Sequence, residues 1–128
     1  MKAPVDRKYS ETHEWFLWDD KIVTMGITQH AADELTDITF VDLPEVGKAV
    51  TAGDVIGEVE SVKATSEIFT AVAGKVVEVN TNLMDHPELV NDDAFDEGWM
   101  IRIQTDSADS LQTLMDAKEY KAFVRNAS

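Results

Sequence analysis

Two segments near the middle of the chain alternate their side chains with a period of two, and one lysine lies between them. The alternation runs through residues 55–62 and resumes in residues 66–71, on either side of Lys63. A period of two is typical of β-strands. Because only a few residues separate the two segments, we predict a tight β-hairpin whose tip carries Lys63 into solvent.

A second hairpin is predicted near the N-terminus. Residues 9–18 are aromatic and polar by turns, residues 19–21 have the composition of a turn, and residues 22–27 are an apolar run. This order of segments is typical of two paired strands. We interpret three aromatic residues of the first strand as packing in the core or at its rim: Trp15, Phe16 and Trp18.

Short helices are expected between the strands. Thr28 is a suitable N-cap for a helix over residues 29–35, after which residues 38–43 return to a strand that Pro44 ends. Residues 82–91 are expected to add a helical turn or two in an insertion, because a proline interrupts the helical spacing there.

The C-terminal tail is predicted to form two short helices that cover one end of the β-structure. Leu111, Leu114 and Met115 have helical spacing, and residues 116–119 resemble the capping box that begins a helix. Residues 125–128 are expected to fray.

An internal repeat bears on the architecture. The segment Gly-Lys-Ala-Val at residues 47–50 returns as Gly-Lys-Val-Val at residues 74–77, and the strand over residues 54–61 has a counterpart in residues 99–105. Two similar β-units that flank the central hairpin favour a quasi-twofold arrangement of strands. The repeat is short, so it indicates an architecture and not a function.

Composition narrows the classes of partner. A length of 128 residues with 44% hydrophobic residues suits a single domain over residues 1–128. Lys and Arg number 11 against 25 Asp and Glu, which gives a net charge of −14 and disfavours nucleic acid as a partner. The acidic balance either keeps the protein soluble or steers its docking onto basic faces of partner enzymes.

Candidate chemistry of the chain itself is sparse. There is no cysteine, which excludes disulfides and thiolate sites. His13, His30 and His86 share no metal-binding spacing, and neither a Gly-rich phosphate loop nor a nucleophile elbow is present. We therefore expect no metal and no intrinsic catalysis, so that any reactive group has to be an added cofactor.

The N-terminal residues and the length of the apolar runs indicate the expected cellular location. The first residues contain neither an apolar signal core nor an Arg/Ser-rich transit pattern, and no apolar run is long enough for a membrane span. We expect a soluble monomer of the bacterial cytoplasm, or of the mitochondrial matrix if the sequence is a processed eukaryotic chain.

Lys63 lies in a motif with a specific resemblance. The run Glu60-Ser61-Val62-Lys63-Ala64 is similar to the lipoylation site of the glycine cleavage system H protein family. Five further motifs of that family occur in the same order along the chain: His13-Glu14-Trp15, Gly26-Ile27-Thr28, residues 41–47, residues 87–91 and residues 98–101. The resemblance implies a mainly β fold with short helices, the flattened barrel-sandwich of lipoyl and biotinyl domains.

The resemblance also implies a function. Lipoic acid would be joined to the Lys63 amine by lipoate-attaching enzymes, and the protein would be a carrier and not an enzyme. It would take an aminomethyl group from a glycine decarboxylase that uses pyridoxal phosphate to an aminomethyltransferase that uses tetrahydrofolate. A dihydrolipoyl dehydrogenase with FAD would then reoxidise the arm.

The family is expected to fold the loaded arm into a surface cleft near its His-Glu-Trp motif. Glu14 is the first candidate to bind the ammonium of the arm, and Thr12, Glu34 and Glu67 are further candidates by the same resemblance. The alternative is that Glu14 only holds the N-terminal hairpin in place. Four positions depart from the usual family pattern, which has glycine at position 36, proline at position 71 and Pro-Tyr at positions 94–95, where this chain has Thr36, Ala71 and Ala94-Phe95.

Other interpretations of Lys63 stay open. Lys63 would only be a solubilising turn residue if it is not modified. The protein would then be an acidic binding module whose barrel scaffolds a partner complex. A lipoyl relay, which donates lipoate to other complexes, fits the same motif. Biotin is disfavoured, because biotin domains present Met-Lys-Met or a similar tip and this chain has Val-Lys-Ala.

Overall fold

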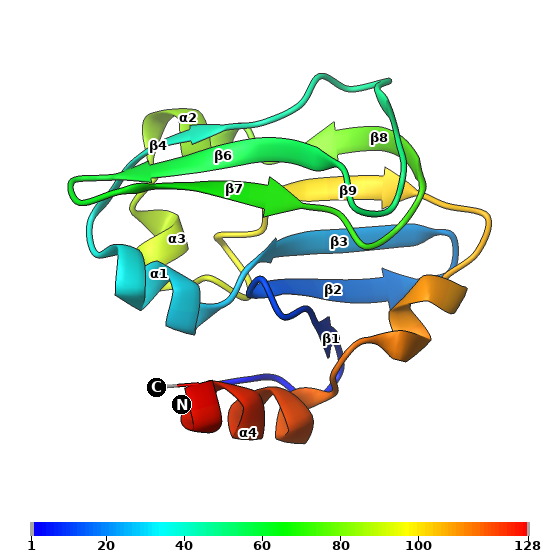
Figure 1. The fold of residues 1–128 in the computed structure, drawn as a ribbon. Helices are drawn as coiled ribbons and strands as arrows, with labels where there is room; N and C mark the ends of the chain where they lie inside the picture. Colours follow the sequence, from blue (N-terminus) through cyan, green and yellow to red (C-terminus); the bar gives the residue numbers. More distant parts are fainter. Residues whose placement is uncertain (1, 128) are drawn as a thin grey trace.

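Two antiparallel β-sheets face each other across an aliphatic core, and short helices cover their ends (Figure 1). The computed structural model describes residues 2–127. The strands are β1 Lys8–Tyr9, β2 Glu14–Asp19, β3 Ile22–Ile27, β4 Ile38–Asp42, β5 Ala49–Val50, β6 Val55–Ser61, β7 Thr65–Phe69, β8 Gly74–Val79 and β9 Ile101–Gln104. The helices are α1 Gln29–Leu35, α2 Asn82–Asp85, α3 Leu89–Asp92, the 3-10 helix η1 Asp109–Thr113 and α4 Ala117–Ala127.

The larger sheet has the order β1-β2-β3-β9-β8-β5 and the smaller one the order β4-β6-β7. No strand of residues 2–127 joins the two sheets into a closed barrel. The expected fold class, a mainly β flattened barrel-sandwich with short helices, is therefore confirmed, with two stacked sheets in place of a closed barrel. The two sheets bury a core made of aliphatic side chains from both, among them Val41, Val59, Ile68, Val23 and Ile103.

The internal repeat has a structural counterpart. Its two Gly-Lys segments lie side by side, because β5 pairs with β8 in antiparallel register, Val50 opposite Gly74 and Ala49 opposite Lys75. Antiparallel contact between equivalent segments is what a twofold relation requires. The longer repeated strands, β6 and β9, lie in different sheets.

The central hairpin departs from strict alternation at one position. Ile56 and Val59 are both buried, although a period of two places them on opposite faces. The register of β6 against β7 shifts between Val55 and Gly57, and such a bulge turns Ile56 toward the core. The hydrophobic pattern alone gives no signal for this shift.

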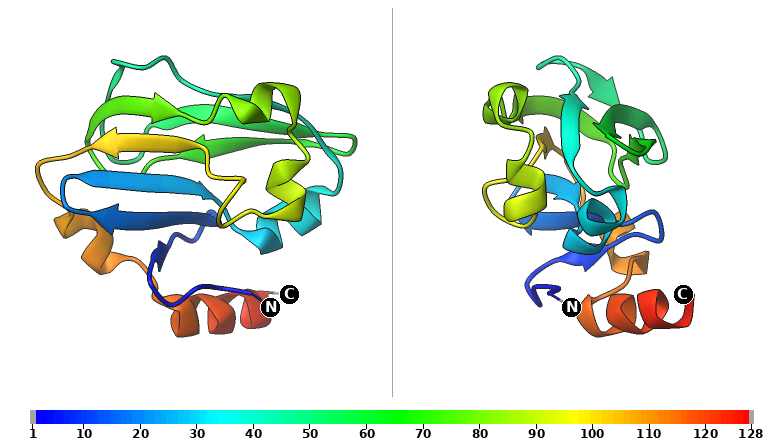
Figure 2. Two further views of the ribbon diagram at one scale, coloured as in Figure 1. Left: turned by 180° about the vertical axis from the view of Figure 1, so that it is seen from behind. Right: turned by 90° about the vertical axis from the view of Figure 1, so that its left-hand side faces the viewer.

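A second, aromatic cluster lies between β1, β2 and α4 on the outer edge of the larger sheet. Tyr9 stacks on Tyr120 with ring centroids 4.8 Å apart, and Trp15 donates a hydrogen bond from Nε1 to the carbonyl of Ala94 at 3.0 Å. Trp15 and Phe16 are buried, as expected, whereas 57% of Trp18 is exposed. Figure 1 and both views of Figure 2 place α4 beneath this edge.

The helix ends follow the predicted capping chemistry, with one correction. Thr28 caps α1 by accepting the N–H of Ala31 at 3.2 Å. Asp116 and Glu119 form the predicted capping box, since each side chain accepts the backbone N–H of the other residue. The expected fraying of residues 125–128 is wrong for residues 125–127, which continue α4, because Val124 and Tyr120 anchor the helix in the aromatic cluster. Ser128 lies outside the described residues.

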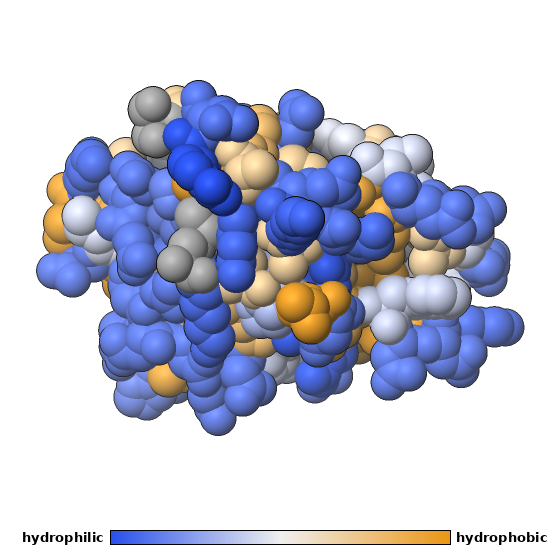
Figure 3. Space-filling view, turned by 90° about the horizontal axis from the view of Figure 1, so that it is seen from below, coloured by the Kyte–Doolittle hydropathy of each residue, from blue (hydrophilic) through white to orange (hydrophobic). Residues whose placement is uncertain are grey.

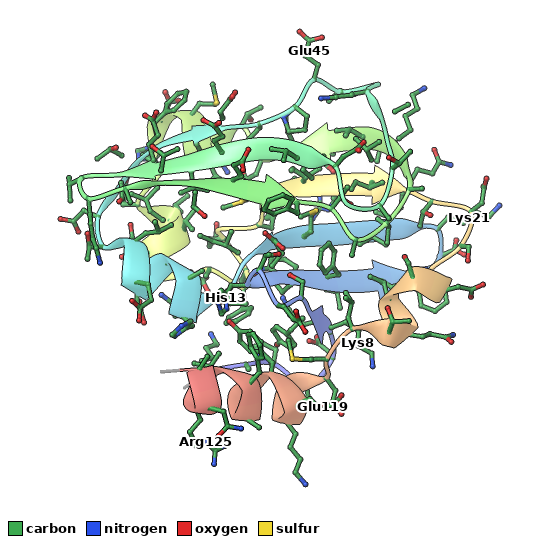
Figure 4. All side chains as sticks on the ribbon, in the orientation of Figure 1. Lys8, His13, Lys21, Glu45, Glu119 and Arg125 are labelled. Atoms are coloured by element: carbon green, nitrogen blue, oxygen red, sulfur yellow. The ribbon has the colours of Figure 1, made fainter. Side chains whose placement is uncertain are left out.

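The surface is largely hydrophilic. Figure 3 shows the face that carries α4 covered mostly by hydrophilic side chains, with apolar ones in separate small patches. Charged side chains such as Lys21, Glu45 and Glu119 point outward at the periphery of the molecule (Figure 4). Within residues 2–127, none of the helices has the length and apolar character that crossing a membrane requires.

Candidate functional site

The tip of the β6–β7 hairpin is a tight turn organised by one serine. The backbone N–H of Ser61 donates to the carbonyl of Ala64 at 2.8 Å. The Ser61 hydroxyl accepts the N–H groups of Lys63 and Ala64 at 3.1 and 3.0 Å, a use of a serine side chain that is common in turns. Lys63 is exposed at this tip, as predicted from the sequence.

The tip also rests on the end of α1. The N–H of Val62 donates to the carbonyl of Asp37 at 3.1 Å, and Lys63 Nζ donates to the carbonyl of Glu34 at 3.1 Å. The carbonyls in the last turn of a helix have no partner within the helix and attract cations. Lys63 is therefore brought beside Glu34, but through the backbone of Glu34 and not through its carboxylate.

Asn91 holds the segment on which the tip rests. Its side-chain oxygen accepts the N–H of Ile38 at 2.9 Å, and its Nδ2 donates to the carbonyl of Thr36 at 2.7 Å. Thr36 adopts φ 63°, ψ −147° at the C-terminal end of α1, a conformation that strongly favours glycine. The position where the family has glycine thus has the backbone geometry of glycine, with a threonine in it.

Glu14 is buried where the two hairpins meet. Only 1% of it is exposed, and one carboxylate oxygen accepts hydrogen bonds from the hydroxyls of Ser10, at 2.6 Å, and Thr12. The other oxygen accepts the N–H of Phe69 at 3.3 Å, at the end of β7. Burial raises the pKa of the Glu14 carboxyl, and these hydrogen bonds act in the opposite direction. Glu14 thereby holds the N-terminal hairpin against β7.

A cleft of about 480 Å³ opens between α1, the loop before β2, β7 and α4. This size is typical of sites that bind small molecules or cofactors. Its lining combines apolar side chains with hydroxyl, imidazole and carboxylate groups. Its lining residues are Thr12, His13, His30, Ala31, Glu34, Leu35, Ser66, Val124 and Ala127.

Two of the four residues proposed to contact the arm line the cleft, and two do not. Thr12 and Glu34 line the cleft, whereas Glu14 lies behind Thr12 and is hydrogen-bonded to it. Glu67 is exposed on β7 opposite Glu58 and is not part of the lining. Only Glu34 is common to the lining of the cleft and the contact with Lys63, so the lysine lies at one end of the cleft.

Nothing in the sequence indicated that His13 and His30 both line the cleft. His13 Nδ1 is 2.8 Å from the hydroxyl of Tyr120, which is 2.7 Å from the hydroxyl of Thr28. The His13 and His30 rings have centroids 5.1 Å apart, and Figure 4 shows His13 between α1 and α4. Burial lowers the pKa of His13, the charge of His30 adds to this, and Glu34 opposes it. The two histidines are 17 residues apart in sequence, and no motif signals their contact.

A metal centre finds no support in this geometry. Among residues 2–127, no three His, Asp or Glu side chains lie close enough together to hold a metal ion.

Comparison with known proteins gives concordant results. The family model described as "Glycine cleavage H-protein" matches residues 7–127. A relative named "Glycine cleavage system H protein" from Anaeromyxobacter sp. (strain K) is 46% identical over 124 residues, which is 97% of this chain and 97% of the relative. A relative from Pisum sativum, "Glycine cleavage system H protein, mitochondrial", is 47% identical over 91% of this chain and 70% of its own length.

A solved structure shares the fold. The crystal structure of a glycine cleavage system H protein from Mycobacterium marinum superposes with a TM-score of 0.88 at 37% sequence identity. The match covers 98% of this chain and 100% of that chain. The likeness therefore includes both sheets and the helices around the cleft.

Proposed function

The chain belongs to the glycine cleavage H-protein family, and from that premise we propose that it is a carrier with lipoic acid attached to Lys63. The observation that carries this proposal is the position of Lys63, exposed at the tip of a hairpin beside a cleft. A lysine in this position is accessible to an attaching enzyme, and its attached group is able to reach a partner's active site.

The residues at the tip fit an amide-linked group. The Lys63 amine has one hydrogen-bond acceptor among residues 2–127, the backbone carbonyl of Glu34. Acylation removes the charge of the amine but keeps one N–H, so the loss amounts to part of one exposed hydrogen bond. The apolar lining residues Ala31 and Leu35 suit the hydrocarbon part of an arm.

When bound, lipoic acid supplies a disulfide that the cysteine-free chain lacks. The cargo that we propose is an aminomethyl group, received from a glycine decarboxylase that uses pyridoxal phosphate and delivered to a tetrahydrofolate-dependent aminomethyltransferase. A dihydrolipoyl dehydrogenase with FAD is the proposed third partner. Covalent attachment raises the local concentration of the cargo to about the millimolar range at each docked site.

Thr12 and Glu34 are the candidates with direct access to cargo in the cleft, because both line it. Glu14 acts behind them: its carboxylate holds the Thr12 hydroxyl and the end of β7 in place. Its binding of the ammonium of the cargo stays a prediction, as does a contact of Glu67 with the arm. Glu34 adds a negative charge to the cleft, which favours a cationic cargo.

The test is the intact mass of the protein after incubation with lipoate, ATP and a lipoate ligase. We expect a single addition, one lipoyl group, and its absence in Lys63→Arg. Unchanged mass of a folded wild-type chain would leave the acidic scaffold as the better interpretation. Full modification without any loading by the decarboxylase would favour a lipoyl relay.

We further propose that the chain is a single domain, works as a monomer and resides in the bacterial cytoplasm, or in the mitochondrial matrix if it is a processed eukaryotic chain. The net charge of −14 supports docking onto basic faces of partner enzymes, because complementary charge accelerates association. Nucleic acid and membrane surfaces, which are commonly negative, are not proposed as partners.

A further inference from the structure

A groove at the end of the molecule opposite Lys63 has no part in the proposed carrier function. Its volume is about 600 Å³, and it lies between β1, the end of β2 and η1. Figure 1 and the left view of Figure 2 place η1 next to the end of β2, whereas the tip of the β6–β7 hairpin extends on the other side of the molecule. A contact made in this groove therefore occupies neither Lys63 nor the cleft beside it.

The groove has an apolar floor and an exposed indole in its lining. Phe16 and Trp18 lie on the same face of β2, because side chains alternate along a strand. Phe16 is buried in the aliphatic core together with Leu111 of η1, whereas 57% of Trp18 is exposed. The Trp18 indole has no hydrogen bond and no ring or cation contact among residues 2–127. Tryptophan is the aromatic side chain that attracts cations most strongly, so this indole is a suitable platform for a cation.

Backbone hydrogen bonds hold both ends of the segment that contains η1. At its beginning, the N–H of Thr105 donates to the carbonyl of Lys21 at 2.8 Å, in the turn that follows β2. The Thr105 hydroxyl also accepts the N–H of Ser107 at 3.3 Å. At its end, Tyr9 and Met115 exchange two backbone hydrogen bonds of 2.8 and 3.0 Å. The groove is therefore formed before a partner binds, which lowers the entropic cost of docking.

The charges around the groove favour a cation. Carboxylates outnumber basic groups in the lining, which contains Asp6, Asp106, Asp109, Asp116, Arg7 and Lys8. Arg7 is engaged within the chain, because its Nε donates to Asp6 at 2.8 Å and its Nη1 donates to the carbonyl of Phe95 at 2.9 Å. The exposed carboxylates of Asp106 and Asp109 have no hydrogen-bond or ion-pair partner among the described residues. Two carboxylates are thus available to a basic group beside the Trp18 indole.

We propose that this groove docks an arginine side chain exposed on a partner enzyme, with the guanidinium stacked on Trp18 and paired with the carboxylates of Asp106 and Asp109. Arginine suits the groove better than lysine, because its planar guanidinium both stacks on aromatic rings and pairs with carboxylates. Its aliphatic stem would cover the apolar floor. The inference rests on the proposed carrier function for the identity of the partners, whereas the groove itself belongs to the unmodified chain.

Other occupants match the groove less well. A second copy of this chain carries the same net charge of −14, so two copies repel each other. Nucleic acid or an acidic peptide meets a lining in which carboxylates outnumber basic groups. Tryptophan and arginine are also the residues that most often dominate the binding energy of protein interfaces. A basic face of a partner enzyme is therefore the occupant that the groove favours.

The first experiment uses the unmodified protein and a peptide probe. The protein is titrated with acetyl-Leu-Arg-Leu-amide, and NMR follows the indole N–H signals of the three tryptophans, assigned with Trp18→Phe. We expect the signals of Trp18 and of residues 106–111 to shift at about 1–10 mM peptide, and those of Trp15 and Trp99 to stay. The same peptide with uncharged citrulline in place of arginine is the matched control and should cause smaller shifts. Equal shifts with both peptides, or no shift at Trp18, would overturn the proposal.

The second experiment measures, by calorimetry, the affinity of the unmodified protein for the glycine decarboxylase, the aminomethyltransferase and the dihydrolipoyl dehydrogenase of the same organism. Trp18→Leu and Asp109→Asn should each weaken binding to the enzyme that uses the groove by about two- to fivefold. Lys8 lines the groove and lies next to η1 (Figure 4), so Lys8→Glu removes a like charge and should tighten binding by a similar factor.

Asp85→Asn is the matched control, because Asp85 is an exposed aspartate of α2 that does not line the groove. It should bind each enzyme as the wild type does, and circular dichroism should show all four variants folded. Wild-type affinity of Trp18→Leu and Asp109→Asn for all three enzymes would refute the docking role. Failure of lipoylation at Lys63 would instead contradict the carrier function, and the peptide titration would still decide whether the groove binds arginine.

Discussion

The β2–β3 and β6–β7 hairpins have the same topology and opposite uses. The β2–β3 hairpin lies inside the larger sheet, with β1 on one side and β9 on the other, and buries Trp15, Phe16 and Met25. The β6–β7 hairpin has a neighbour on one side only, β4, and its tip extends beyond the other strands (Figure 1). One hairpin therefore supports the fold, whereas the other exposes Lys63 at its tip.

The difference also explains how each turn is stabilised. The β2–β3 turn contains Asp20 at φ 56°, a left-handed conformation that aspartate tolerates. The β6–β7 turn relies on the hydroxyl of Ser61 and on contacts with the end of α1. A presenting tip is thus held by polar groups at its base, with little apolar burial of its own.

The largest expected effect is a complete loss of function without a loss of stability. Lys63→Arg should abolish lipoylation, because the ligase forms an amide with a lysine amine, and peptide mapping should find no lipoate elsewhere. The melting temperature should match that of the unmodified wild-type protein, since the Lys63 contact is exposed. Lipoate on Lys48 or Lys75, or a loss of several degrees in Lys63→Arg, would show that the tip is not a separate presenting element.

The converse result is expected in the β2–β3 hairpin. Trp15→Ala removes a side chain that is 1% exposed and packs in the aromatic cluster, so the free energy of unfolding should fall by about 3–5 kcal/mol. Urea unfolding measures this loss. At a temperature where the variant is folded, the rate of lipoylation should equal that of the wild type; a slower rate would show that the two hairpins are coupled.

Glu14 lies where the hairpins meet, so its pH dependence tests that contact. Its pKa is raised in the folded protein, which means that folding favours the neutral carboxyl. The contribution is fully present below the ordinary pKa and is lost as the pH rises through the folded value. Glu14→Gln cannot ionise, and it should therefore gain stability relative to the wild type as the pH rises above the ordinary glutamate pKa of about 4.3.

The measurement is urea unfolding of both proteins at several pH values. A stability difference that moves in favour of the wild type as the pH rises would mean that the ionised carboxylate is the preferred form. Ammonia release from the loaded carriers gives the second readout. A release rate in Glu14→Gln that is about ten- to a hundredfold faster would assign the charge of Glu14 to the protection of the cargo, and equal rates would leave it as a hairpin anchor.

The smallest expected effect is a gain. Thr36→Gly places glycine at φ 63°, ψ −147°, which relieves backbone strain but increases the entropy of the unfolded chain. The net change should be a stabilisation of at most about 1 kcal/mol, read from the urea midpoint. Thr65→Gly, at an exposed position of β7, is the control and should destabilise the protein. Loss of stability in Thr36→Gly would mean that the threonine side chain contributes more than its backbone costs.

The sequence predicted the elements that depend on local pattern. The period of two located β6 and β7, and the Thr28 and Asp116 caps located the beginnings of α1 and α4. These signals are local because hydrogen bonds of a cap or alternation in a strand involve residues close in the chain. The resemblance to a family supplied the lysine and its chemistry.

The missed features are of two kinds. The contact of Lys63 with the Glu34 carbonyl and the meeting of His13 with Tyr120 join segments that are distant in the sequence. The bulge at Ile56 lies inside the predicted hairpin, where the hydrophobic pattern gives no signal for it. The sequence leaves two roles open for Glu14, a carboxylate of the arm cleft or an anchor of the N-terminal hairpin, and its burial has one local signal. Hydroxyl residues stand two and four positions before it, Thr12 and Ser10, and both donate to its carboxylate.

The contact between Glu14 and β7 has a consequence for self-association. Among the described residues, β7 is an edge strand, paired with β6 on one side only, and open edges invite strands of other molecules. The Glu14 carboxylate occupies the N–H of Phe69 at this edge, and Glu67 adds a charge further along it. A second chain that pairs here has to displace a buried carboxylate and approach a negative edge, so the open edge of β7 is protected from growing into aggregated sheets.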